Sequence, residues 1–236
     1  MSRWPVAAGM VLLAACGRTP DHPRVPATSP PAVATIQRAD APAPIVADAT
    51  PRDDAWVLPG AFAPDRDLAW LRRRFGAANV RVGQVPGAEG ELFPGVVLYP
   101  DDPTRRAYLY FQDETHLRGL SLVRVLDAPS RWRLDNGVQP GMPLAGLVAL
   151  NGAPIRFSGF DWDYGGAIAD WKGGRLAPRG DDPVRRGIQL GHGEAPTGSY
   201  PLGDAEFASD DPRYPRLGQV AIVGAISVSF PGEDDL

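Results

Sequence analysis

The 236-residue chain contains a single cysteine, Cys16, a single lysine, Lys172, and three histidines. One cysteine excludes any disulfide bond within the chain. The sequence also lacks an HExxH motif, a GxSxG motif and a Walker sequence, so it carries no signature of a metalloprotease, a serine hydrolase or a nucleotide-binding enzyme. The formal net charge is −4. A mildly acidic protein is a poor binder of nucleic acid, because the phosphate backbone attracts basic surfaces.

Residues 1–15 have the organisation of a secretory signal peptide, with Arg3 before an apolar run, VAAGMVLLAA. This run is too short for a membrane-spanning helix, which needs about 20 residues. It ends in LAAC, which resembles the lipobox of bacterial lipoproteins: a leucine, two small residues and the cysteine that becomes the acylated N-terminus. The resemblance implies that acyl chains on Cys16 anchor the protein in a lipid bilayer. Since Gly17 follows the cysteine, it also implies an outer-membrane lipoprotein that faces the periplasm.

Residues 16–55 are rich in proline and alanine and contain few large apolar residues. Such a segment cannot bury enough apolar surface to offset the entropy lost on ordering. We therefore expect a disordered tether that reaches on the order of 100 Å, at about 3 Å per residue. A tether of that length would hold a folded domain clear of the membrane.

An internal repeat lies in the remaining residues, 56–236. The same offset of 76 residues aligns Leu68 with Leu144, Leu71 with Leu147 and Gly76 with Gly152. In each copy, leucines three residues apart predict a short helix, and the glycine predicts its left-handed C-terminal cap. A strand follows each helix, at 80–85 and at 155–160.

Each copy continues with a predicted hairpin and one more strand. The first copy has VVLYP, AYLYF and then LSLVRV, and the second has FDWDY, AIADW and, at the end of the chain, QVAIVGAISVSF. The predicted fold class is α+β, with two tandem helix-on-antiparallel-sheet modules at 56–128 and 129–236 that can share one continuous sheet. Between the last two strands, residues 177–217 are expected to form a long irregular loop.

Two resemblances follow from these patterns. The element order over about 65–235 resembles the tandem modules of the SmpA/BamE and β-lactamase-inhibitor-protein group. Three motifs of this chain resemble motifs of a set of uncharacterised bacterial lipoproteins. The three motifs are GMPLAGLVALNG (141–152), GFDWDYGG (159–166) and the W-x-G-G-x-L of 171–176. The second resemblance supports the lipoprotein class and implies no particular activity.

The motif GFDWDYGG and the segment after it form the densest group of candidate binding residues. If Gly165-Gly166 is a two-residue hairpin turn, side chains alternate between two faces of the hairpin. One face then carries Phe160, Trp162, Tyr164, Ala167, Ala169 and Trp171, and the other carries Asp161, Asp163, Ile168 and Asp170. The aromatic face is expected to pack beneath the helix as core. The alternative is a stacking platform for a sugar or a peptide.

Three carboxylates on one sheet face repel one another. The sequence leaves four ways to offset this repulsion: solvent, an arginine such as Arg156 or Arg175, a basic partner, or Ca²⁺, which prefers carboxylate and carbonyl oxygens. The sequence does not require a cofactor. The cofactor that it suggests is Ca²⁺.

Two further groups of polar residues lie near the C-terminus. His192 shares a glycine-rich stretch with Glu194 and Ser199, which is expected to be a surface loop, since a catalytic triad requires rigid support. A second acidic patch contains Asp204, Glu206, Asp210 and Asp211.

The sequence therefore predicts a membrane-anchored periplasmic lipoprotein that is not an enzyme and that binds an envelope protein or peptidoglycan. The candidate binding residues are Asp161, Trp162, Asp163, Tyr164, Asp170 and Trp171. One alternative is a calcium-dependent binding module with Asp161, Asp163 and Asp170 as ligands. Another is a hydrolase with an acidic site. No nucleic-acid partner is expected.

Overall fold

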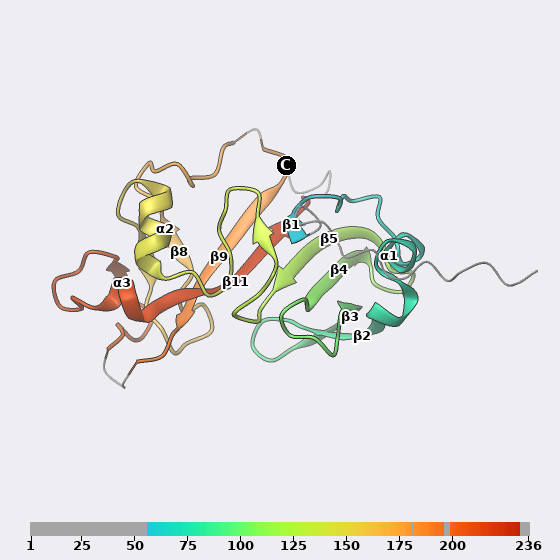
Figure 1. The fold of residues 1–236 in the computed structure, drawn as a ribbon, viewed down its shortest axis with the longest axis horizontal. Helices are drawn as coiled ribbons and strands as arrows, with labels where there is room; N and C mark the ends of the chain where they lie inside the picture. The colour runs from blue at the N-terminus through green and yellow to red at the C-terminus, as the bar shows by residue number, and fades with distance from the viewer. Residues whose placement is uncertain (1–55, 181, 196–198, 232–236) are drawn as a thin grey trace, which may run out of the picture. The chain divides into compact units, whose positions relative to one another are not determined.

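A computed structural model describes residues 56–180, 182–195 and 199–231. All of them belong to one compact unit. The predicted signal peptide (1–15), the lipidation site Cys16 and the predicted tether (16–55) lie outside the described residues. Within the described part, no helix is both long enough and apolar enough to span a bilayer. The fold is α+β, as predicted, with most of the regular structure in antiparallel sheet (Figure 1).

The N-terminal half is a helix followed by a four-stranded meander. The short strand β1 (Val57–Leu58) comes first. The helix and strands are then α1 (Leu68–Phe75), the 3₁₀ turn η2 (Ala77–Asn79), β2 (Val80–Pro86), β3 (Leu92–Leu98), β4 (Ala107–Asp113) and β5 (Arg118–Val125). Each of the four strands from β2 to β5 pairs antiparallel with the next one in the chain. Asp67 caps α1, since its side chain accepts a hydrogen bond from the Trp70 amide at 2.7 Å.

The C-terminal half repeats this order of elements. It consists of β6 (Arg133–Leu134), which pairs in parallel with β1, then α2 (Leu144–Asn151), β7 (Arg156–Ser158), β8 (Ile168–Asp170), β9 (Arg185–His192), β10 (Glu206–Ala208), α3 (Leu217–Val220) and β11 (Ala221–Ser229). Strand β7 pairs with β8, a bridge between Ala167 and Gln189 joins the β8 side to β9, and β9 pairs with β11. Strand β10 adds to the outer side of β7.

The two halves meet through their last strands. Strand β11 pairs antiparallel with β5, so that Ile226 lies opposite Val125 and Val228 opposite Val123. This pairing gives a six-stranded sheet in the order β2-β3-β4-β5-β11-β9. Strands from both predicted modules therefore share one sheet, whereas the exact division of the chain at 128/129 stays a prediction.

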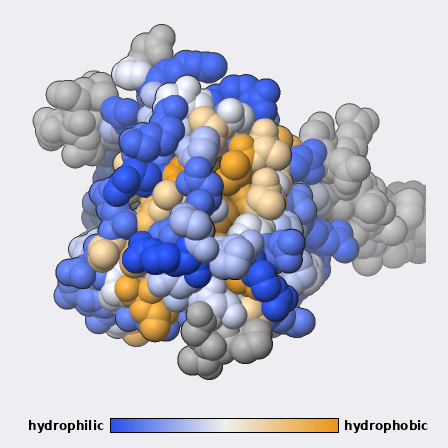
Figure 2. Space-filling view, turned by 90° about the vertical axis from the view of Figure 1, so that its left-hand side faces the viewer, coloured by the Kyte–Doolittle hydropathy of each residue, from blue (hydrophilic) through white to orange (hydrophobic). Residues whose placement is uncertain are grey.

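Both helices contribute to a single hydrophobic core on one face of this sheet. Leu71 of α1 and Leu147 of α2 belong to the same buried cluster as Val123 and Ile226. Strand residues between the buried ones point the other way, because side chains alternate along a strand. The helices of the described residues, α1, α2 and α3, all contribute to this core, and the opposite face of the six-stranded sheet is called the open face below. Figure 2 looks onto the end of the domain that carries α2 and α3 and shows apolar residues between hydrophilic ones.

The predicted long loop at 177–217 is wrong. This stretch contains the eight residues of β9, all of β10 and the start of α3. The sequence pattern does not indicate strand β9, because its only large apolar residues are Ile188 and Leu190 and it begins with Arg185-Arg186. Its strand conformation comes from pairing with β11 along its whole length.

Asn151, the last residue of α2, is a buried polar side chain with a full set of partners. Its Nδ2 donates to the carbonyls of Ala153 and Trp171, both at 2.9 Å, and its Oδ1 accepts from the Leu176 amide at 3.1 Å. A Cβ at Gly174 would lie 2.2 Å from that Oδ1. The asparagine before the helix cap and the glycine of the W-x-G-G-x-L motif therefore belong to one interaction, which holds the segment after β8 against α2.

Replacing Asn151 with alanine should lower the free energy of unfolding by about 3 kcal/mol, because it removes three hydrogen bonds of a buried side chain and leaves the part-buried Trp171 carbonyl and Leu176 amide without that partner. Urea unfolding followed by tryptophan fluorescence measures this loss. The control is Asn136→Ala, which removes one hydrogen bond to the Val138 amide from a half-buried turn and should cost less than about 1 kcal/mol. Equal losses for the two variants would contradict the structural role of Asn151.

Candidate functional site

The predicted two-residue turn at Gly165-Gly166 is wrong, because β7 and β8 pair as a hairpin through a longer loop that contains residues 159–166. Strand β7 ends at Ser158, and β8 starts at Ile168. The observed register places Arg156 opposite Asp170 and Phe157 opposite Ile168. Asp161 has a positive φ of 63°, which is incompatible with a strand. The alternation of side chains expected for Phe160–Tyr164 therefore does not exist.

The aromatic residues of the motif divide between the core and the surface. Phe160 is buried and packs on Phe157, with 5.8 Å between ring centroids, and Trp171 packs at the edge of the core. Trp162 and Tyr164 are 36% and 56% exposed. Their rings form an edge-to-face pair with centroids 5.4 Å apart. The expectation of a core-packed aromatic face holds for Phe160 and Trp171 and fails for the exposed pair.

The three aspartates also separate. Asp161 lies 3.4 Å from His192 Nε2. Asp170 pairs with Lys172 at 3.0 Å, and the Lys172 backbone amide, followed by its side chain, holds the pKa of Asp170 below its usual value. No hydrogen bond or ion pair to Asp163 is made within the described residues. The described part of the chain has no group of three or more His, Cys, Asp or Glu side chains that could hold a metal ion.

Of the two arginines expected to compensate the acidic face, Arg156 lies opposite Asp170 and its charge helps to lower the Asp170 pKa, but both arginines make their direct bonds elsewhere. Arg156 pairs with Glu206 at 2.9 Å, which brings one member of the second acidic patch beside β7. Arg175 donates to the carbonyls of Ala149 and Leu150 at the C-terminal end of α2, both at 2.8 Å. Arg175 therefore stabilises a helix end.

His192 lies at the end of β9, and its partner is Asp161. The neighbours Glu194 and Ser199, considered from the sequence, make no hydrogen bond to it in the described structure. The imidazole stacks on Tyr200, with centroids 4.3 Å apart, and the Tyr200 hydroxyl donates to the Val220 carbonyl at 2.9 Å. This arrangement packs the loop 159–166 against β9, and among the described residues no serine or cysteine side chain bonds to the imidazole.

Strand β9 fixes the loop 159–166 through its backbone. The Leu190 amide donates to the Gly166 carbonyl at 2.8 Å, and Gln189 Nε2 donates to the Gly165 carbonyl at 2.8 Å. Gly166 has a φ of 76°, and a Cβ there would lie 2.1 Å from the Leu190 carbonyl oxygen. The glycine pair of the motif is thus required for close approach of two backbones, and this approach holds Asp163 and Tyr164 beside β9.

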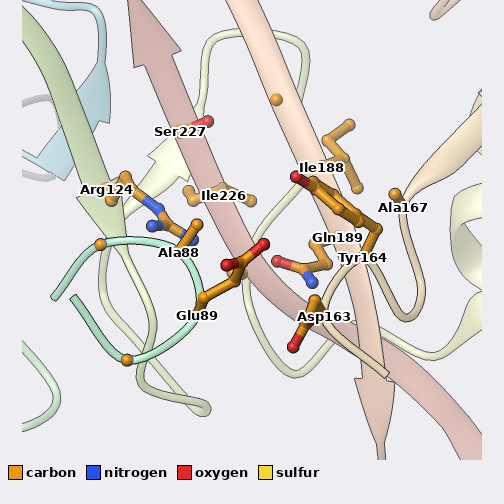
Figure 3. A pocket seen from close by; sticks show the side chains of 14 residues that line it. Ala88, Glu89, Arg124, Asp163, Tyr164, Ala167, Ile188, Gln189, Ile226 and Ser227 are labelled. Carbon is orange, nitrogen blue, oxygen red and sulfur yellow. The ribbon is translucent and has the colours of Figure 1, made fainter. Parts of the chain in front are cut away.

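A groove of about 680 Å³ runs across the open face of the sheet, and Figure 3 shows its lining. Its floor is formed by strands β5, β11 and β9. The small residues Gly187, Ala225 and Ser227 line this floor and project little above the sheet. One bank is the turn 87–90 between β2 and β3. The other bank is Asp163 and Tyr164 of the loop 159–166. We call this feature the open-face groove.

Three charged side chains line the open-face groove, one from each of three elements. Arg124 comes from β5, Glu89 from the turn 87–90 and Asp163 from the loop 159–166 (Figure 3). None of the three takes part in an ion pair with a described residue. Glu89 and Asp163 are exposed and Arg124 is half-buried.

Tyr110 places Arg124 and the turn relative to each other. Its hydroxyl donates to the Pro86 carbonyl at the end of β2. Burial raises the pKa of Tyr110, and the nearby Arg124 guanidinium offsets part of that rise. The strand that leads into the turn 87–90 is therefore held against the open face close to Arg124.

No model of a protein family, no curated protein and no solved structure matches this chain. The site therefore has to be argued from its own residues. Of the predicted binding residues, the structure brings Asp163 and Tyr164 to the open-face groove, with the Trp162 ring against Tyr164. Asp161, Asp170 and Trp171 lie outside its lining.

Four residues of the groove were not among the predicted binding residues: Glu89, Arg124, Gln189 and Ser227. A signal for two of them exists, because Arg124 and Ser227 occupy the polar positions of the alternating segments LSLVRV and AISVSF, and polar positions of a half-buried strand face away from the core. The same pattern cannot show that Arg124 and Ser227 lie opposite each other, as they do in the observed register.

Replacing Gly166 with alanine should destabilise the domain by about 3 kcal/mol or more, because a methyl group there collides with the Leu190 carbonyl as well as straining the backbone. Gly173→Ala is the matched control, since Gly173 has a similar φ of 69° and open space around it. It should cost only about 1 kcal/mol for the left-handed backbone. Thermal unfolding of both variants separates the two effects, and an equal cost would show that the close approach to β9 contributes nothing.

Proposed function

We propose that the chain is a non-enzymatic binding protein, anchored to the periplasmic face of the outer membrane through acylated Cys16, and that the open-face groove receives its envelope partner. The observation that carries the proposal is the convergence of Arg124, Glu89 and Asp163 on one groove without ion-pair partners among the described residues. Charged side chains usually find partners or disperse over the surface, so three that face one concave surface indicate a surface built for a ligand.

The groove is better suited to binding than to acid-base catalysis. Glu89 and Asp163 are both exposed, whereas the general acid of a glycoside hydrolase is a carboxyl shielded from water. The exposed pair of Asp161 and His192 has no serine or cysteine nucleophile beside it in the described structure. Within the described residues, neither alternative from the sequence, the acidic hydrolase or the calcium-dependent module, has a constellation that favours it.

The proposed tether also suits a binding protein. The lipobox LAAC and the proline-rich residues 16–55 precede the domain in sequence, and a tether of that composition gives the domain reach and orientational freedom. Reach and orientational freedom both help a binding face to contact a partner in the envelope.

The anchor is tested by replacing Cys16 with serine in cells that export the protein. The wild-type chain should fractionate with membranes and incorporate radiolabelled palmitate, because diacylation provides stable membrane binding. The Cys16→Ser chain should incorporate no label and appear in the soluble fraction. If the wild-type chain is not acylated, the lipoprotein part of the proposal is wrong. The assignment of the open-face groove as the binding site is not affected by that result.

The groove is tested with a photo-crosslinking amino acid placed at Ser227, in the middle of its floor, in intact cells. A covalent adduct should form there. Arg124→Gln combined with Glu89→Gln should reduce that adduct about tenfold or more, because charge-assisted contacts each contribute about 1.5–3 kcal/mol.

The matched control position is Ser229. It lies on the same strand and the same face, opposite Leu122, but outside the groove lining, so it should give no such adduct. Adducts of equal yield at the two positions, or none at Ser227, would mean that the open-face groove is not the partner site.

A further inference from the structure

The charges in the open-face groove differ in sign and do not neutralise one another. Arg124 reaches the groove from its floor, whereas Glu89 and Asp163 reach it from the two banks (Figure 3). No nitrogen of Arg124 lies within 4.0 Å of either carboxylate, since no such ion pair occurs among the described residues. A complementary ligand must therefore bring an anionic group to Arg124 and a cationic group to the two carboxylates.

The neutral groups of the floor are suited to amides. The Ser227 hydroxyl makes no hydrogen bond to a described residue, and it lies over Gly187, where a Cβ would be only 2.2 Å from its oxygen. The Gln189 side chain uses its Nε2 on the Gly165 carbonyl, which leaves its Oε1 as an acceptor. A hydroxyl and a carbonyl oxygen can accept from the N–H groups of a peptide and, through the hydroxyl, donate to its C=O groups.

The dimensions of the floor set the length of the ligand. From β5 across β11 to β9 there are two strand spacings, or about 10 Å at roughly 4.8 Å each. An extended peptide advances about 3.3 Å per residue, so about three residues cross this floor. The volume of about 680 Å³ falls within the range of roughly 300–1,000 Å³ that ligand sites occupy.

We propose that the open-face groove binds a zwitterionic peptide segment of about three residues, whose carboxylate pairs with Arg124 and whose ammonium group lies between Glu89 and Asp163. This proposal rests on the assignment of the groove as the binding site. The exposed Trp162–Tyr164 pair beside the Asp163 bank packs against the peptide at its ammonium end. The small residues of the floor allow the peptide backbone to approach the sheet.

The test is calorimetric titration of the mature acylated protein in detergent with four forms of trialanine: free, N-acetylated, C-amidated, and both. Free trialanine should bind tightest, and each single modification should weaken binding about tenfold or more. Arg124→Gln should abolish the difference between the acid and the amide. Glu89→Gln with Asp163→Asn should abolish the difference between the free and the acetylated amine.

The control substitutions remove charge of the same sign as each test and lie outside the groove. Arg118→Gln is on the same strand as Arg124, and Glu91→Gln is next to the turn of Glu89. Both side chains are exposed and make no ion pair with a described residue. Neither control should change the order of the four peptides.

Three results would overturn the peptide proposal: no binding of free trialanine at millimolar concentration, equal affinity for all four forms, or binding of the neutral sugar chitotriose in place of trialanine. If any of these occurs while the Ser227 adduct still forms in cells, the groove is the partner site and its ligand is of another class. If the Ser227 adduct is also absent, the assignment of the groove itself fails.

Discussion

The pairing of β5 with β11 is the interaction on which the rest of the structure depends. It joins two helix-and-meander halves into one sheet and lets both helices share one core. The same pairing sets Arg124 of the first half opposite Ser227 of the second. The floor of the open-face groove therefore exists only where the two halves meet, and neither half alone contains it. A shift of one residue in this register would put Arg124 and Ser227 on opposite faces of the sheet and expose core residues of the strand that slipped.

The motif GFDWDYGG contributes to the site through its backbone as much as through its side chains. Its two glycines bring the loop into contact with β9, and the contact between Asp161 and His192 adds to this packing. Asp163 and Tyr164 then project from a loop that is held at several points, and Figure 3 shows them beside Gln189 and Ile188. These contacts hold the loop 159–166 on one bank. On the other bank, the Tyr110 hydroxyl holds β2, the strand that leads into the turn 87–90.

Local patterns in the sequence predicted much of the fold and little of the site. Leucine spacing and capping glycines located α1 and α2, and alternation located the strands of the first half and β11, because these signals lie within one element. Strand β9 could not be found, since its conformation depends on β11. The alternation of aspartate and aromatic residues suggested a strand at 160–164, whereas contacts with β9 stabilise a loop there. Arg124 and Glu89 meet Asp163 only through tertiary pairing, which no local pattern records.

The β5–β11 pairing also bears on the kinetics of folding. Almost the entire C-terminal half lies between the two strands, so the central pair of the sheet forms only after a large loop has closed. Domains dominated by such distant antiparallel contacts fold slowly compared with domains built from local ones. Under the lipoprotein proposal, slow folding would keep the polypeptide extended while it crosses a membrane, before Cys16 is acylated. The arrangement that builds the groove would thus also delay its appearance until export is complete.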